Sequence, residues 1–281
     1  MERVRPAAVA GSFYPADAEE LSALLDECFD AHPLGPQGNR SPTRSLLGGM
    51  APHAGYMYSG PCAAHLYSRI DTAAGLAIVV GVNHRGRGAR AALSPAEFWE
   101  TPLGRVPIDR EAGDCLRGEV DFLSVDERAH RDEHSIEVQL PFLQTLLDEF
   151  TFLPISLAHV SEDECRRLGE ALARLYEAQT AAGQKVLLVA SSDLNHYRSP
   201  AETERLDGLA LESILALDPA GLLHTVAENR ITMCGAAPTA VMLFAAAELG
   251  AKQSRLLKHC HSGDAKPMDE VVGYASVAIE V

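Results

Sequence analysis

The chain has 281 residues, of which 39 are acidic and 24 are basic, so its formal net charge at pH 7 is −15. Nucleic acids and anionic membranes attract proteins through clustered Lys and Arg, and the sequence has no basic run, so we expect neither as a partner. The hydrophobic content of 47% is ordinary for a globular protein. No apolar run approaches the roughly 20 residues that a membrane-spanning helix needs.

The cysteines indicate a reducing environment. Six of them are scattered along the chain without a C-x-x-C pair, which is typical of neither a disulfide framework nor a zinc finger. The N-terminal residues lack the apolar stretch of a signal peptide, so we expect a cytoplasmic protein. The one linker-like stretch, 33–45, is short and near one end, so residues 1–281 are predicted to form a single domain.

In the first half of the chain, one helix precedes two strands. An apolar stripe that begins after Asp17 predicts a helix over 17–29, with Asp17 and Glu20 spaced like a capping box. Short runs of Leu and β-branched residues then predict buried strands at Leu46–Ala51 and Leu76–Val82.

The second half alternates in the same way. A strand over Phe150–Leu157 is interrupted by Pro154, and Lys185–Ala190 predicts a further buried strand. Capping residues and apolar periodicity predict three helices, and two strand-like segments close the chain. The helices are expected at 161–179, 199–217 and 238–249, and the closing strands at 255–260 and 271–281. Buried strands that alternate with helices predict a three-layer α/β/α sandwich around a mostly parallel or mixed sheet.

Chemically reactive side chains follow three of the predicted strands. His53 follows the run 46–51, His84 follows 76–82, and Asp193 and His196 follow 185–190. Ligands of open α/β sheets bind beyond the carboxyl ends of the strands. If these strands are neighbours, the four side chains form one site.

Cys234 is the cysteine whose position indicates a chemical role. It precedes the helix predicted to open at Pro238, and a helix N-terminus lowers the pKa of a thiol and favours the thiolate that binds metals. Cys28 and Cys165 fall on apolar helix faces and are interpreted as core residues. Two imidazoles and a thiolate suit Fe(II), Cu or Zn better than Mg or Ca. His53, His84 and Cys234 would leave open coordination positions, which is typical of a reactive site.

Two further patterns have simpler interpretations. The run from His130 to His134 spells H-x-x-E-H, the inverted zincin pattern, but both His would have to lie on one formed helix. A helix in this part of the chain would begin at Asp132 or Ser135, which leaves His130 outside it, so a zinc peptidase is disfavoured. His259-Cys260-His261 is interpreted as a strand end in preference to a metal site.

The longest motifs resemble those of the Memo family. They include the opening VRPAAVAGSFYP and, in order, APHAGYMYSGPCAAHLY, GVNHRG, LSPAEFWETPLGRVPID, HRDEHSIEVQLPFL, ASSDLNHY, MCGAAPT and the closing VVGYASVAIEV. This resemblance spans nearly the whole chain. It implies a LigB-like fold, similar to that of the class III extradiol dioxygenases, which hold non-haem Fe(II) with two His and a Glu.

Memo proteins resemble those enzymes with a Cys in place of the Glu. The resemblance therefore implies His53, His84 and Cys234 as metal ligands. His196 would act as an acid or base with Asp193 beside it, and Fe(II) would be the favoured ion, with Cu or Zn as alternatives. His134, Glu137 and Tyr56 would support the substrate pocket. Prokaryotic members of the family often accompany a radical-SAM protein and an AMMECR-type domain protein, which are therefore possible partners.

Two functions remain open at this stage. One is a metal-dependent redox enzyme, such as an oxygenase, that acts on a small chelating substrate. The other is a non-catalytic module that binds a ligand or peptide in the same pocket, like the eukaryotic Memo adaptor that recognises phosphotyrosine peptides. A phosphate site would require clustered Arg or Lys, and only Arg85, Arg87 and Arg198 lie near the pocket motifs, which favours the enzyme.

Overall fold

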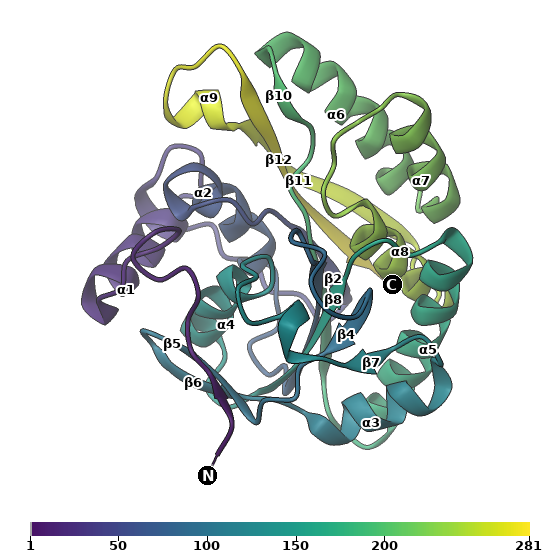
Figure 1. Ribbon diagram of the computed structural model, residues 1–281. Coiled ribbons are helices and arrows are strands. Elements are labelled where there is room, and N and C mark those ends of the chain that lie inside the picture. The colour runs from purple at the N-terminus through teal and green to yellow at the C-terminus, as the bar shows by residue number, and fades with distance from the viewer. Residues whose placement is uncertain (1) are drawn as a thin grey trace.

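A computed structural model describes residues 2–281 and shows a mixed β-sheet between two layers of helices (Figure 1). The nine strands of this sheet have the order β10-β12-β2-β9-β3-β8-β4-β7, with β11 paired to β12. They are β2 (Leu46–Ala51), β3 (Leu76–Val82), β4 (Ala91–Leu93), β7 (Ser124–Val125), β8 (Thr151–Leu157), β9 (Val186–Ser191), β10 (His196–Arg198), β11 (Gln253–His261) and β12 (Val271–Glu280).

Four adjacent strands at the centre of the sheet run parallel. β2 pairs with β9, β9 with β3, and β3 with β8, all in the same direction. The flanking strands β12 and β4 run antiparallel to their central neighbours. The carboxyl ends of the four central strands therefore meet at one edge of the sheet, which is where the candidate site lies.

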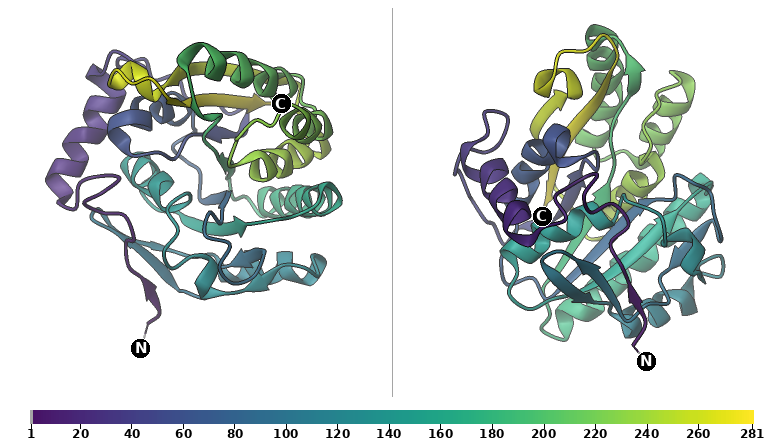
Figure 2. Two further views of the ribbon diagram at one scale, coloured as in Figure 1. Left: turned by 45° about the horizontal axis from the view of Figure 1, so that its top comes forward. Right: turned by 60° about the vertical axis from the view of Figure 1, so that its left-hand side comes forward.

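The helices cover the sheet on both faces (Figure 2). One layer contains α1, α2 and α4 together with a single π-turn at Glu27–Ala31, and the other contains α3, α5, α6, α7 and α8. Their bounds are α1 (Ala18–Asp26), α2 (Tyr56–Tyr67), α3 (Arg110–Glu119), α4 (Leu140–Leu146), α5 (Glu162–Ala181), α6 (Pro200–Leu215), α7 (Pro219–Glu228) and α8 (Ala236–Glu248), with the short α9 (Ser262–Ala265) before β12.

The central strands are apolar on both faces because each layer of helices needs its own core. Along β3, Ile78 and Val80 pack with the α5 and α8 side, whereas Ala77 and Val79 pack with the α1 and α2 side. Side chains of a strand alternate between the faces of a sheet, so a continuous apolar run is what two covered faces require. The predicted three-layer α/β/α architecture is confirmed, with a mixed sheet.

A second, three-stranded sheet has the order β1-β5-β6 and holds the N-terminal segment. Its strands are β1 (Val4–Arg5), β5 (Phe98–Thr101) and β6 (Gly104–Pro107). Short 3-10 turns at Glu127–Ala129 and Glu137–Gln139 precede and follow the segment 130–136, which lies next to the candidate site. Within the described residues, no helix is long and apolar enough to cross a membrane.

The start of α5 offers a test of how local sequence contributes to stability. Ser161 and Glu164 form the predicted capping box, with each side chain accepting the backbone N–H of the other. We expect Ser161→Ala to lower the free energy of unfolding by about 1 kcal/mol, because it removes the acceptor of one helix-end N–H. Urea denaturation measures this change. The control Glu177→Ala, at an exposed position on the same helix, should change stability by less than about 0.5 kcal/mol.

Candidate metal centre

Three adjacent strands deliver the predicted side chains to one place. His53 follows β2, Asp193 and His196 follow β9, and His84 follows β3, and these strands are direct neighbours in the order β2-β9-β3. The backbone N–H of His53 donates to Asp193 Oδ1 at 2.7 Å, which joins the ends of β2 and β9. The condition on which the sequence-based site depended is therefore met.

Cys234 reaches this edge from the loop between α7 and α8. A Cβ on the next residue, Gly235, would lie 2.3 Å from Ser192 Cβ, so only glycine permits this approach to the end of β9. The Gly235 N–H donates to Ser192 Oγ at 3.0 Å and fixes the loop there. As a result, Cys234 Sγ lies 3.1 Å from His53 Nε2.

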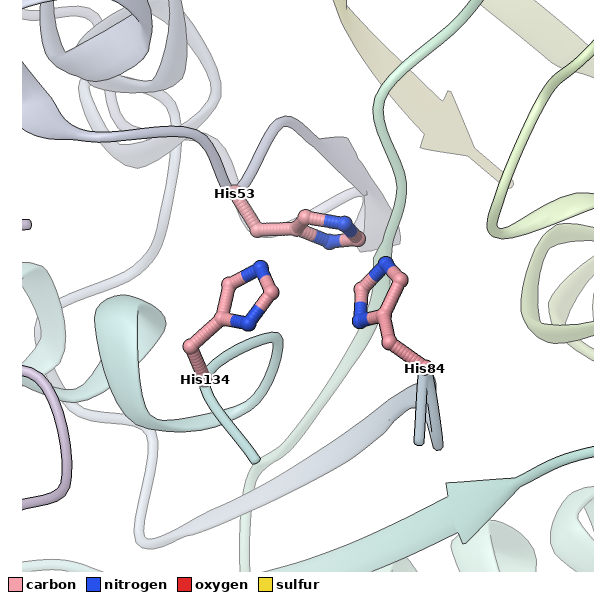
Figure 3. Close-up of side chains that lie close together, drawn as sticks. All are labelled: His53, His84 and His134. Atoms are coloured by element: carbon pink, nitrogen blue, oxygen red, sulfur yellow. The ribbon is translucent and has the colours of Figure 1, made fainter. Parts of the chain in front are cut away.

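A compact group of metal-competent donors consists of three imidazoles, those of His53, His84 and His134 (Figure 3). One ligand atom from each lies within 4.8 Å of the others, close enough to hold a metal ion. The rings of His84 and His134 are stacked with centroids 4.6 Å apart, and the His53 ring stands nearly perpendicular to both.

The hydrogen bonds of His53 fix its tautomer in the form that a metal requires. Ser191 Oγ donates its only proton to the Ser135 carbonyl, so it must accept from His53 Nδ1 at 2.9 Å. Gln139 Nε2 also donates to this hydroxyl and holds it in place. His53 Nε2 therefore carries a free lone pair on the side that faces Cys234.

Glu133 plays the same part for His84 and lies close to the His134 ring. Its Oε1 accepts from His84 Nδ1 at 2.8 Å and lies 3.2 Å from His134 Nδ1. A carboxylate accepts only, so His84 Nδ1 carries a proton and Nε2 is the ring nitrogen left for a metal. A carboxylate behind a ligating His is a recurrent way to orient the ring and raise its basicity. The donor set thus fits a transition metal.

The pKa values of His53, His134 and Glu133 favour the protonation states that bind a cation. Burial, and then the neighbouring His84, lower the pKa of His53 well below its ordinary value. Burial, and then His53, lower the pKa of His134 to about 4. Burial alone would raise the pKa of Glu133, but the hydrogen bond from His84 and the adjacent imidazoles lower it to about 2. At neutral pH His53 and His134 are therefore uncharged beside a carboxylate, which is the state that binds metals.

A cavity of about 510 Å³ opens over the cluster. Its polar lining includes the three imidazoles with Asp193, His196, Thr232 and Cys234, and its walls include Phe13, Tyr197 and Val272. This volume suits a small molecule, and the cavity places any ligand directly against the free imidazole nitrogens.

Comparisons with known proteins identify the family. The model of the family described as Memo-like protein matches residues 5–278. The chain belongs to the Memo family. MEMO1 family proteins of Ignicoccus hospitalis and Pyrobaculum aerophilum are 44% and 42% identical to it, with 98% of each chain covered. The crystal structure of an uncharacterized protein of Escherichia coli K12 has a similar fold, with a TM-score of 0.50 and 12% identity, over 74% of this chain and 87% of that one.

The thiol of Cys234 differs from the sequence-based expectation. We expected the helix N-terminus to lower its pKa, but burial, and then the nearby Asp193, raise it. The structure therefore has a neutral thiol beside the neutral His53 imidazole. A cation bound in this Memo site would have to displace the thiol proton before sulfur could become a ligand.

His196 also differs in its partner. Asp193 was expected beside His196, and both line the cavity, but His196 Nδ1 bonds to the Thr232 carbonyl at 2.9 Å, and Asp193 Oδ1 accepts from the His53 backbone. Asp193 therefore does not fix the His196 tautomer, because the β9 end turns this carboxylate toward β2. The carbonyl places the proton on Nδ1 and leaves His196 Nε2 as an acceptor. Burial raises the pKa of Asp193.

Glu137 and Tyr56 were expected to support the pocket. Both side chains are buried and already hydrogen-bonded, Glu137 to Arg5 and Tyr14, and Tyr56 to the Val138 carbonyl. These hydrogen bonds join Glu137 to the N-terminal segment and Tyr56 to the turn at Glu137–Gln139, not to the imidazole cluster.

Sequence reasoning treated His134 as a supporting group and overlooked Glu133. His130 is buried and bonds to the Ala92 carbonyl, outside the cluster. The H-x-x-E-H pattern therefore contains two residues of the site, Glu133 and His134, although not on a helix. The signal was the Glu-His pair itself, which lies inside the family motif HRDEHSIEVQLPFL.

The raised thiol pKa predicts how metal affinity depends on pH. Below that pKa, binding through sulfur releases one proton from Cys234, whereas His53 and His134 are already neutral at pH 7. Zn²⁺ affinity should therefore increase by about tenfold per pH unit more in the wild type than in Cys234→Ser. Competition titrations with a chelator between pH 7 and 8.5 measure this difference. Identical pH dependence in both proteins would remove Cys234 from the ligand set.

Proposed function

We propose that this protein is a metal-dependent redox enzyme, dioxygenase-like in type, that acts on a small chelating substrate. The observation that carries the proposal is the convergence of three imidazoles, a thiol and a further His on one small cavity. His53 and His84 are proposed as ligands whichever residue supplies the third donor. The third donor is Cys234, as the family resemblance implies, or His134, whose ligand atom lies within 4.8 Å of those of His53 and His84.

The donor set favours a first-row transition metal. Imidazole and thiolate ligands suit Fe(II), Cu and Zn, and three protein donors leave positions open to a substrate. Fe(II) is the proposed ion, by analogy with the similar dioxygenases. A metal held here would supply Lewis acidity and redox chemistry, and the remaining steps fall to the side chains.

His196 is placed to move protons. Its Nδ1 is bonded to a carbonyl, so Nε2 can accept a proton from a substrate hydroxyl at the cavity wall and return it later. The backbone N–H of His196 donates to Thr232 Oγ1 at 2.7 Å, which limits motion of the residue. Asp193, buried against His53, sets the position of that ligand and contributes negative charge.

A ligand-binding module remains the alternative, and the charges near the pocket argue against a phosphate as its ligand. Arg87 is paired with Asp132 at 2.6 Å, and Arg85 Nε donates to the Asp132 carbonyl. Two of the three arginines that the sequence placed near the pocket are therefore occupied.

Metal analysis of anaerobically purified protein tests the site. We expect one transition-metal ion per chain in the wild type and a marked loss in His84→Ala, because His84 Nε2 is a ligand in every version of the site. X-ray absorption should show sulfur at about 2.3 Å if Cys234 is the third ligand. Equal metal content in wild type and His84→Ala would contradict the proposed centre.

A separate variant tests the proton-transfer step. His196→Ala should keep the metal and lower the rate of O₂ consumption with catechols or thiols by about 10²- to 10⁴-fold, because a positioned acid or base is lost. The control His224→Ala changes an exposed His on α7 and should leave the rate unchanged. Loss of metal in His196→Ala would show that His196 is a ligand. If loaded wild type consumes no O₂ with any substrate, the binding module is favoured.

A further inference from the structure

We propose that Arg5 and Glu137 are positioning residues of the metal centre, so that docking of the N-terminal segment 5–14 and metal binding stabilise each other. This inference rests on the metal site proposed above but not on any catalytic activity. Neither residue contacts the cavity cluster. Each acts through the segment 130–137, which carries Glu133 and His134.

The carboxylate of Glu137 is the anchor of the N-terminal segment. It is fully buried and accepts four hydrogen bonds, all from that segment. The donors are Arg5 Nη1 at 2.5 Å, the backbone N–H groups of Ala8 at 2.8 Å and Val9 at 3.0 Å, and Tyr14 Oη at 2.6 Å. Without the segment, a charged group in the interior would lose all of these partners, which is strongly unfavourable.

Arg5 connects this anchor to the residues that hold the metal ligands. Its Nε donates to the His130 carbonyl at 2.8 Å, and its Nη2 donates to the Glu133 carbonyl at 2.6 Å. The guanidinium carbon lies 4.0 Å from the centre of the Trp99 ring. Arg5 as a whole residue is only 5% exposed. The planar guanidinium thus fixes both ends of the segment 130–133 at once.

Glu133 completes the connection on the side of the cluster. Its backbone carbonyl is bound by Arg5, while its carboxylate accepts from the His84 N–H at 2.7 Å and the His134 N–H at 2.9 Å, in addition to the His84 ring. A shift of this residue would move His84 and His134 together. Metal affinity depends on such outer partners because they set the direction of the ligand lone pairs.

A second contact joins the N-terminal segment to the cluster directly. The ring of Phe13 packs against that of His134 with centroids 4.5 Å apart. Its backbone carbonyl accepts the N–H of Tyr56 at the start of α2. The segment therefore touches a metal-competent imidazole at one point and orients it through Arg5 at another.

The first test measures Co²⁺ affinity and the visible spectrum of the bound ion, which reports the coordination geometry. Arg5→Met and Glu137→Gln should bind Co²⁺ about 10- to 100-fold more weakly than wild type and alter the spectrum. Arg5→Lys should bind Co²⁺ more tightly than Arg5→Met but more weakly than wild type. Lys keeps the positive charge but lacks the planar guanidinium that binds two carbonyls at once. The matched control is Glu280→Gln, which breaks the partly buried ion pair between Arg69 and Glu280 at the other end of β12. It should leave the affinity unchanged.

The second test uses only the wild type and remains valid if a variant fails to fold. Coupling between two events is reciprocal, so saturating Zn²⁺ should slow amide hydrogen exchange in residues 5–14 relative to the metal-free protein. Unchanged exchange there, or variants that bind Co²⁺ like wild type with the same spectrum, would overturn the inference and leave the metal centre standing. Wild type that takes up neither ion would overturn both.

Discussion

The carboxylate of Glu133 is the interaction on which the metal-competent arrangement depends. It is almost fully buried and lies next to Nδ1 of both His84 and His134, so both rings direct their Nε2 atoms away from it and toward His53 (Figure 3). Burying a carboxylate is costly unless charged or N–H partners surround it, and here backbone and imidazole N–H groups do so. The same negative charge would compensate a cation held by the imidazoles.

This carboxylate is fixed because the segment that carries it is fastened to the end of the central sheet. The hydroxyl of Ser135 donates to the Val82 carbonyl and accepts the Val82 N–H. A side chain thus satisfies the backbone groups of Val82, the last residue of β3. Close approach requires a glycine opposite, since a Cβ on Gly81 would lie 2.5 Å from Ile136 Cγ1. Ser135 also offers its carbonyl to Ser191, so the ends of β3 and β9 are joined through one residue.

Much of the fold follows from local pattern, and the site follows only in part. The runs that predicted β2 and β3 have the observed bounds, because continuous apolar strands of this length are what a doubly covered sheet needs. Helix α2 was not predicted, since Gly60 and Pro61 interrupt it and its apolar residues surround it without a clear stripe. The short strands β4 to β7 were missed because two to four residues carry too little periodicity.

The convergence of His53 and His84 could be predicted because both follow strands, and strand ends of a parallel sheet share an edge. The place of His134 could not. It lies in an irregular segment whose conformation is set by contacts distant in sequence, such as those of Arg5 with residues more than a hundred positions away. Propensity and spacing carry no information about such contacts.

The protein contains a single tryptophan, and its position makes it a natural reporter. Trp99 is buried with its ring close to both the Arg5 guanidinium and the His130 imidazole, and its Nε1 donates to Ser94 Oγ. The indole emission of the whole chain therefore arises at the junction between the N-terminal segment and the segment below the metal-competent cluster. Intrinsic fluorescence can follow events at that junction in the unmodified protein, without a label and without interference from a second fluorophore of the same kind.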